Sequence, residues 1–172
     1  VKSIVDVGGH CGFAALYMLR AFPDATVTVY EPHPEHLRRL RDHLNWNGLS
    51  ARAVVVPACA GIADGQVRLS DDGCESAVLA DDADQGIPVP IVDWVRHLPD
   101  GPIDLLKMDA EGAEYELLDD PRFGDIAART RVLVMEWHRS ARIDDPRAWA
   151  SERFKQYGFA RTYDGTVQYE TA

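Results

Sequence analysis

The sequence predicts an α/β fold built on a doubly wound, mostly parallel sheet of seven strands, with an antiparallel hairpin at its C-terminal end. Three observations support this prediction. Short apolar runs rich in β-branched residues alternate with segments of helical periodicity. A glycine-rich turn joins the first run to the first helix, and charged residues follow several later runs. Ligands bind at the carboxyl ends of the strands in such sheets, so functional residues are expected there.

The first half of the chain alternates strands with helices. Strands are expected at residues 4–7, 25–30 and 54–56, and helices at residues 14–21 and 35–47. Pro23 ends the first helix, Pro34 precedes the second, and Gly48 stands where a left-handed C-cap belongs.

The second half begins with short extended segments and then returns to alternating strands and helices. Residues 66–69 and 76–79 are expected to pair as a hairpin over the sheet edge, and residues 89–92 are expected to be extended. Asp93 is expected to cap a short helix through His97. Strands are expected at residues 103–108 and 131–136, helices from Glu114 to Leu118 and at residues 146–157, and the terminal hairpin at residues 159–163 and 167–169.

Length and composition indicate one domain, spanning residues 1–172. A content of 46% hydrophobic and 27% charged residues is ordinary for a globular protein. Because the sequence enters a strand almost directly after Val1, we expect the chain to be trimmed at its N-terminus. No apolar run approaches the roughly 20 residues of a membrane helix, and no signal peptide is visible, so no membrane partner is expected.

The net charge indicates which partners are disfavoured, and the cysteines indicate the cellular compartment. A net charge of −10 disfavours a nucleic-acid partner, because binding a polyanion needs clustered Lys and Arg. Cys11, Cys59 and Cys74 show no C-x-x-C spacing, which favours reduced thiols and a cytoplasmic location over a disulfide framework or a zinc site.

The first strand runs into the sequence Asp6-Val-Gly-Gly-His-Cys-Gly12. This spacing lacks the G-x-G-x-x-G of dinucleotide enzymes, because His10 and Phe13 occupy its second and third glycine positions. No Gly-Lys-Ser/Thr follows, which excludes a P-loop. Glu31 ends the second strand, where a carboxylate can accept both hydroxyls of an adenosine ribose. Loop and acid together predict a nucleoside pocket, although nicotinamide enzymes use the same acid.

Charged residues also follow the strand predicted at residues 103–108. The run Lys107-Met-Asp-Ala-Glu-Gly-Ala-Glu114 places several charges at a carboxyl end, where they are costly unless they are paired or face a cleft. Lys107 is expected to brace Asp109 or Glu111 as an ion pair. Gly112 permits a sharp turn into the following helix.

These motifs resemble those of the FkbM-type family of class I S-adenosylmethionine-dependent methyltransferases. The resemblance is carried by the glycine loop, by Tyr30-Glu31-Pro32, by the run from Lys107 to Glu114 and by Met135-Glu136-Trp-His138. The K-x-D-x-E-G-x-E run is specific to this family, whereas the glycine loop is shared by class I methyltransferases generally. One departure is His10, where the family often has Asn or another small polar residue.

The resemblance implies a Rossmann-like methyltransferase fold, S-adenosylmethionine as the cofactor, and a small-molecule acceptor with a hydroxyl on a sugar or a natural product. It implies a cofactor pocket made by Asp6, Gly8, Gly9, His10, Gly12, Glu31, Pro32, Cys59, Ala60 and Asp109. The residues implied to act in catalysis are Lys107, Asp109, Glu111, Glu136 and His138.

His138 is the candidate base for the hydroxyl proton, because its unperturbed pKa of about 6.5 suits this task. Asp109 or Glu136 is expected to orient its ring. The alternative is a structural role for His138 at the end of its strand. Together with Glu111 these residues also form an oxygen-rich set that would suit Mg²⁺, although the predicted site includes no metal.

Other functions stay open at this point. One is a nucleotide-binding oxidoreductase, and another is a donor-binding domain without acceptor chemistry. Nucleic-acid methylation is disfavoured by the acidity of the chain and by the absence of an N/D-P-P-Y/F motif. His36 and His43 lie on a charged helix and are expected to face solvent. His33 lies beside it and is expected in a solvated loop, with contact to the adenosine as the alternative.

Overall fold

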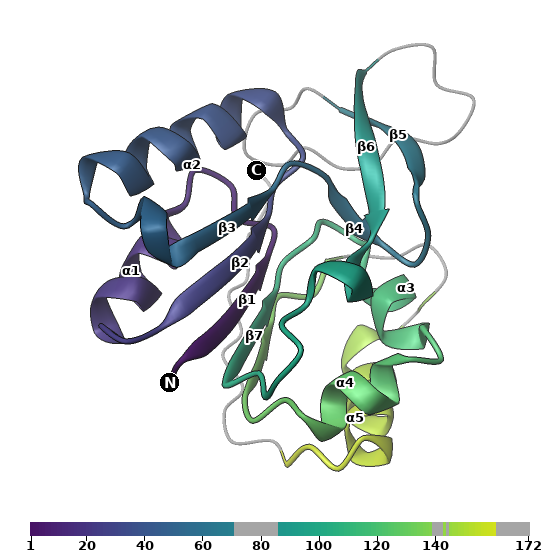
Figure 1. Cartoon of the computed structure of the whole chain (residues 1–172). Coiled ribbons are helices and arrows are strands. Elements are labelled where there is room, and N and C mark those ends of the chain that lie inside the picture. The colour runs from purple at the N-terminus through teal and green to yellow at the C-terminus, as the bar shows by residue number, and fades with distance from the viewer. Residues whose placement is uncertain (71–85, 139–142, 144, 161–172) are drawn as a thin grey trace, which may run out of the picture.

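The computed structural model describes residues 1–70, 86–138, 143 and 145–160, which form an α/β fold with two sheets (Figure 1). The main sheet has five strands, all parallel, in the order β3-β2-β1-β7-β8, and a smaller sheet has the order β4-β6-β5. The strands are β1 (Ser3–Val7), β2 (Thr26–Tyr30), β3 (Ala53–Val56), β4 (Cys59–Gly61), β5 (Gly65–Leu69), β6 (Ile87–Asp93), β7 (Leu105–Met108) and β8 (Leu133–Met135). The helices are α1 (Phe13–Ala21), α2 (Pro34–Trp46), α3 (Glu114–Asp119), α4 (Phe123–Ala128) and α5 (Pro146–Gln156), with 3₁₀ helices at Ser50–Arg52 and Trp94–His97.

The order of the strands reverses beside β1, as the predicted doubly wound sheet requires. The chain proceeds outward from β1 through β2 to β3, and later forms β7 and β8 on the other side of β1. The carboxyl ends of β1 and β7 therefore meet at the switch point, where ligands bind in this class of sheet. The predicted terminal hairpin lies outside the described residues from residue 161 onward, so its two strands remain a prediction.

Helices cover both faces of the main sheet, because side chains alternate across each strand. On β1, Ile4 belongs to one core and Val5 to the other. The first core packs α1 and α2 against the sheet around Leu40, which is fully buried. The second core joins the 3₁₀ helix at Trp94 to α4 at Phe123. In Figure 1 the two groups of helices lie on opposite sides of the main sheet.

The smaller sheet adds a wall beside the carboxyl edge of the main sheet (Figure 1). β5 pairs antiparallel with β6, and the segment 76–79 predicted as its partner lies outside the described residues. Asp93 ends β6 and accepts a hydrogen bond from the backbone N–H of Val95, which confirms the predicted cap. β4 and α4 are not predicted from the sequence, because segments of three and six residues are too short to display a period.

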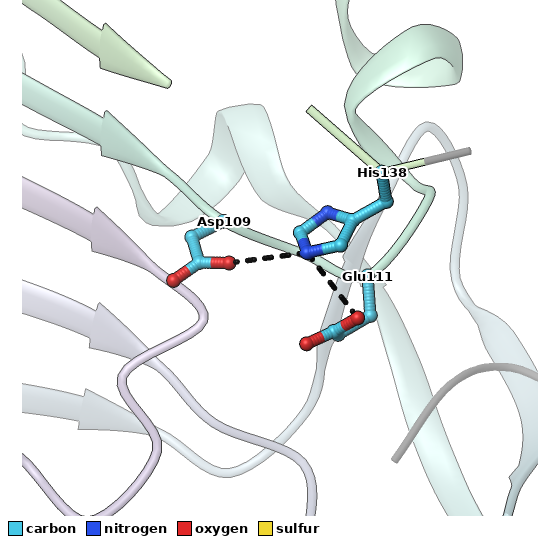
Figure 2. A group of neighbouring side chains, drawn as sticks. All are labelled: Asp109, Glu111 and His138. Atoms are coloured by element: carbon cyan, nitrogen blue, oxygen red, sulfur yellow. Dashed lines mark ion pairs between the residues drawn. The ribbon is translucent and has the colours of Figure 1, made fainter. Parts of the chain in front are cut away.

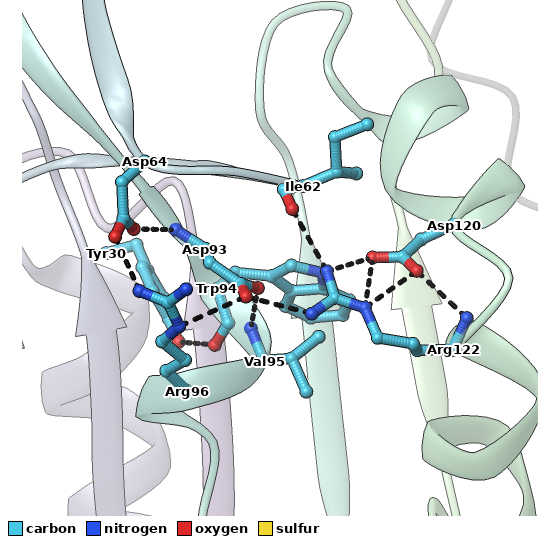
Figure 3. Close-up of polar contacts among 9 residues, drawn as sticks. All are labelled: Tyr30, Ile62, Asp64, Asp93, Trp94, Val95, Arg96, Asp120 and Arg122. Atoms are coloured by element: carbon cyan, nitrogen blue, oxygen red, sulfur yellow. Dashed lines mark hydrogen bonds and ion pairs between the residues drawn. The ribbon is translucent and has the colours of Figure 1, made fainter.

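Arg122, directly before α4, ties this smaller sheet to the helical layer (Figure 3). Its guanidinium donates to both carboxylate oxygens of Asp120 and, at 2.9 Å, to Asp93 at the end of β6. It also donates to the carbonyl oxygen of Ile62. Both aspartates are buried, and Arg122 lowers the pKa of each carboxyl. The wall formed by the smaller sheet is thus held in place by charge as well as by packing.

The outer face of α2 carries charged side chains that are paired with one another. Arg38 and Arg39 are exposed there and pair with Glu35 and Asp42, so these arginines belong to a solvated helix face. Within the described ranges, no helix has both the length and the apolar character that crossing a membrane would require.

Candidate functional site

The glycine loop follows β1 and lies between the ends of β2 and β7. The N–H groups of Gly8 and Gly9 both donate to the carbonyl oxygen of Tyr30, at 3.1 and 2.9 Å. Gly8 has a φ of 83°, and a Cβ at this position would lie 1.7 Å from the carbonyl oxygen of Asp109. No other residue fits there, so this glycine is what lets the ends of β1 and β7 approach each other.

Glu31 is buried at the end of β2 and holds the loop through its carboxylate. Its Oε2 accepts the N–H of His10 at 2.6 Å, and its Oε1 accepts the N–H of His33 at 2.8 Å. Burial raises the pKa of Glu31, and these two hydrogen bonds oppose that effect. An ionised carboxylate offers about four acceptor positions, so two are left over for further donors.

Imidazole rings surround this carboxylate. The ring of His36 lies 4.1 Å from that of His10 and 4.3 Å from that of His33, between centroids, and its Nδ1 is 3.6 Å from Oε1 of Glu31. His33 and His36 are buried, so the expectation that they face solvent is wrong; the register of α2 turns them toward the glycine loop. Burial lowers the pKa of His36 to about 4, which leaves this ring neutral at pH 7.

A cavity of 590 Å³ opens at the carboxyl edge of the main sheet. Sites for small molecules and cofactors commonly have about 300–1,000 Å³. The wall combines the glycine loop, the pocket of Glu31, the smaller sheet and the turn after β7. Its residues are Val7, Gly8, His10, Tyr30, Glu31, Pro32, His33, His36, Ala58, Cys59, Ala60, Val67, Leu69, Ile91, Asp109, Ala110, Glu111, Gly112, Ala113 and Glu116.

Lys107 braces the strand ends beneath this cavity. It lies opposite Asp6 in the pairing of β1 with β7, and its Nζ is 3.1 Å from Oδ1 of Asp6. The same Nζ is 3.2 Å from Oδ2 of Asp109 and donates to the carbonyl oxygen of Gly8 at 3.0 Å. Burial opposes the charge on Lys107, but the two carboxylates outweigh it and raise the lysine pKa. The predicted pair with Asp109 is present, and Asp6 is an additional partner.

Glu114, the first residue of α3, is a fully buried acid at the centre of the site. Its Oε1 accepts the backbone N–H of Ala110 at 2.6 Å, and its Oε2 accepts that of Gly112 at 2.9 Å. Oε1 also lies 2.9 Å from Nδ1 of His138. Although burial favours the neutral acid, these bonds lower the pKa of Glu114, so it is a carboxylate at neutral pH.

The bond to Glu114 turns the other nitrogen of the His138 ring toward two further carboxylates (Figure 2). Nε2 lies 3.7 Å from Oδ1 of Asp109 and 3.3 Å from Oε2 of Glu111. This geometry corrects the expectation that Asp109 or Glu136 orients the ring. Glu136 is exposed, and the carboxylate on Nδ1 is Glu114.

The neighbouring acids also set the charge of His138. The hydrogen bond to Glu114 is the main cause that raises the pKa of His138 to about 9; partial burial opposes it, and the charges of Glu111 and Asp109 support it. The ring is therefore mostly protonated at neutral pH, and it has to lose a proton before it can act as a base. Its backbone carbonyl accepts the hydroxyl of Tyr115 at 2.7 Å, which anchors this segment to α3.

The residues predicted for the site divide into two groups. Those that line the cavity are Gly8, His10, Glu31, Pro32, Cys59, Ala60, Asp109 and Glu111. Asp6, Gly9, Gly12, Lys107 and His138 lie behind or beside the lining, and Glu136 is exposed. Gly9 and Gly12 are packing positions, because a Cβ at either would press on Leu40.

Sequence reasoning missed Glu114 and the inward-facing His36; His33, which lines the cavity, was expected in a solvated loop, with contact to the adenosine only as the alternative. The acid had a detectable signal, since it ends the charged run and starts a helix three residues after Glu111. The sequence carries no signal that these rings face inward; this follows only from how α2 packs against the glycine loop.

Two sequence comparisons relate the chain to methyltransferases. A family profile described as the methyltransferase FkbM domain matches residues 6–161. "Methyltransferase 1" from Beauveria bassiana (strain ARSEF 2860) is 27% identical over 142 residues, which cover 67% of this chain and 56% of the relative. The chain thus spans little more than half the length of that relative.

Solved structures share the fold. Methyltransferase FkbM from Methylobacillus flagellatus KT superposes with a TM-score of 0.52 at 20% identity, over 74% of this chain and 30% of that one. A precorrin-6y C5,15-methyltransferase from Geobacter metallireducens GS-15 has a TM-score of 0.54 at 16% identity, over 93% and 65%. The StiE O-MT structure gives 0.51 at 14% identity, over 91% and 44%. At these identities the likeness establishes the fold.

Proposed function

This chain belongs to the FkbM methyltransferase family, and on that basis we propose that it transfers the methyl group of S-adenosylmethionine to a hydroxyl oxygen of a small molecule. One observation carries the proposal. The cavity has the glycine loop and Glu31 in one wall, and Asp109 and Glu111 in the turn after β7. A donor pocket and a charged acceptor wall thus share one space at the switch point of the sheet.

The residues around Glu31 fit an adenosyl group. Each oxygen of Glu31 uses one lone pair on a backbone N–H and keeps another for a ribose hydroxyl. Ala58, Val67 and Ile91 supply an apolar surface for a base beside that carboxylate. When bound, S-adenosylmethionine supplies a methyl group already activated on a positively charged sulfur.

The role of the chain's own residues is to position the acceptor and to take up its proton. Asp109 and Glu111 line the cavity and can accept hydrogen bonds from hydroxyl groups of the acceptor. His138 is the candidate proton acceptor at Nε2, held by Glu114 through Nδ1. Because the pKa of His138 is raised to about 9, catalysis by this base should become faster as the pH rises toward that value.

The acceptor class follows from the resemblance and from the charge. We expect a sugar or natural-product hydroxyl, and we do not expect a nucleic acid at a chain with a net charge of −10. The cytoplasmic location indicated by the cysteines remains a prediction.

Calorimetry with S-adenosylhomocysteine tests the donor pocket directly. We expect the chain to bind it and Glu31→Ala to bind it at least tenfold more weakly, because two ribose hydrogen bonds to a carboxylate are lost. Glu35→Ala, an exposed acid on the neighbouring helix, is the matched control and should leave the affinity unchanged.

Two further measurements complete the test. Binding of NAD with no binding of S-adenosylhomocysteine would refute the proposal in favour of an oxidoreductase. Methyl transfer is then followed by mass spectrometry, with methyl-labelled donor and a panel of hydroxylated sugars and polyketides. Label found only on nitrogen or carbon would refute the hydroxyl acceptor.

A further inference from the structure

We propose that Asp109, Glu111 and His138 form a binding site for one divalent first-row transition-metal cation of the Mn²⁺ or Zn²⁺ type. Among the residues that the structure describes, this is the group of three or more potential ligand side chains that comes close enough together to hold an ion. The proposal concerns the acceptor wall of the proposed methyltransferase, and its effect on methyl transfer rests on that function. Binding of the cation itself does not depend on that function.

The three ligand atoms have the separations that one ion requires. Nε2 of His138 lies 3.3 Å from Oε2 of Glu111 and 3.7 Å from Oδ1 of Asp109, and one ligand atom from each residue lies within 4.8 Å of the others (Figure 2). An ion about 2.1 Å from each ligand keeps adjacent ligands about 3 Å apart and opposite ligands about 4.2 Å apart. Small movements of the two partly exposed carboxylates would bring the three atoms onto adjacent positions.

Two neighbours, the buried Glu114 and the partly exposed Lys107, orient two of these ligands. Glu114 occupies Nδ1 of His138, and Lys107 occupies Oδ2 of Asp109. The atoms left facing one another are Nε2 of the histidine and Oδ1 of the aspartate. Metal-binding histidines commonly donate a hydrogen bond from their second ring N–H to a carboxylate in this way, which fixes the ring and the tautomer. Glu114 is itself fixed by two backbone N–H groups, so the histidine is positioned in advance.

The kind of ligand decides the kind of cation. Mg²⁺ and Ca²⁺ prefer all-oxygen sites, whereas imidazole nitrogen favours transition metals. One imidazole with two carboxylates therefore favours Mn²⁺ or Zn²⁺ over the Mg²⁺ considered from the sequence. Glu136 does not belong to this group of close ligand atoms, so the set considered from the sequence loses one carboxylate.

The location of the group gives the cation a role in substrate binding. Asp109 and Glu111 line the cavity, so coordination positions not filled by protein would face the acceptor. A hydroxyl oxygen could then bind the cation directly. The cation and a proton compete for Nε2, so base catalysis by His138 and metal binding cannot occur at the same moment, and the experiment below distinguishes them.

Titration of chelator-treated protein with Mn²⁺, followed by the electron paramagnetic resonance signal of free Mn²⁺, tests the site. We expect one Mn²⁺ per chain, and at least tenfold weaker binding in Asp109→Asn and in Glu111→Gln. Glu114→Gln, which leaves all three ligands in place, should weaken binding about 10–100-fold. Glu136→Gln is the matched control for a nearby acid and should bind like the parent chain. Circular dichroism confirms that each variant is folded.

The Mn²⁺ titration and the binding of S-adenosylhomocysteine together distinguish a failure of this inference from a failure of the proposed function. No Mn²⁺ bound by the parent chain, or equal affinity in all four variants, overturns the inference. If S-adenosylhomocysteine still binds to the same sample, the proposed function stands and His138 keeps the base role. If Mn²⁺ binds with the expected pattern and S-adenosylhomocysteine does not bind, the metal site stands and the proposed function fails.

Discussion

Replacing Glu114 with glutamine removes one charge from the centre of the site and keeps the size of the side chain. Glutamine has one acceptor oxygen, so at least one of the donors at Ala110, Gly112 and His138 loses its partner. The rise in the pKa of His138 from 6.5 to about 9 corresponds to roughly 3 kcal/mol in favour of the charged ring. Because the bond to Glu114 is the largest cause, the pKa of His138 should fall by about 1–2 in the variant.

The same coupling predicts how stability depends on pH. The folded-state pKa of His138 lies above the unfolded value, so the charged pair stabilises the fold fully below pH 6.5. Its contribution is lost as the pH rises through about 9. The parent chain without metal should therefore lose up to about 3 kcal/mol of unfolding free energy across this interval, and Glu114→Gln should lose much less.

Nuclear magnetic resonance of the histidine ring nitrogens, in protein treated with a chelator, measures the pKa directly. Urea denaturation at several pH values measures the stability. Glu116→Gln, an exposed acid on the same helix, is the control and should leave the pKa of His138 in place. A pKa that stays near 9 in Glu114→Gln, or an equal decrease in Glu116→Gln, would refute the assignment of Glu114 as the partner of the ring.

Three further predictions concern the loop, the smaller sheet and turnover. Gly8→Ala should lower the unfolding free energy by about 2–4 kcal/mol, since its Cβ would meet the carbonyl of Asp109, whereas Gly48→Ala, with open space around it, should cost only about 1–2 kcal/mol. Arg122→Met should lower the midpoint of chemical denaturation, because it removes the guanidinium from the buried Asp120 and leaves the buried Asp93 with the exposed Arg96; an unchanged midpoint would mean that solvent replaces the guanidinium. His138→Ala should lower kcat for methyl transfer by about 100-fold or more while the donor affinity measured by calorimetry stays the same, and an unchanged kcat would remove this histidine from the mechanism.

The sequence determined the fold because its signals are local. Valine-rich strands, the glycine turn after Val7 and the helix-ending Pro23 each act within a few residues, and the strands and helices they predict are present within a few residues of the expected positions. The position of Glu31 was determined in the same way, since a residue that ends a parallel strand has to lie at the carboxyl edge.

Only the tertiary structure decided which side chains meet at that edge. Lys107 reaches Asp6 because β1 and β7 are neighbours, and His138 meets Glu114 because the chain returns after β8 to the start of α3. These partners are distant in sequence, or lie on elements whose relative register no local pattern encodes. The charged residues of the site can thus be predicted from the sequence. Which of them contact one another depends on tertiary packing, and these contacts set the pKa values and the side-chain orientations.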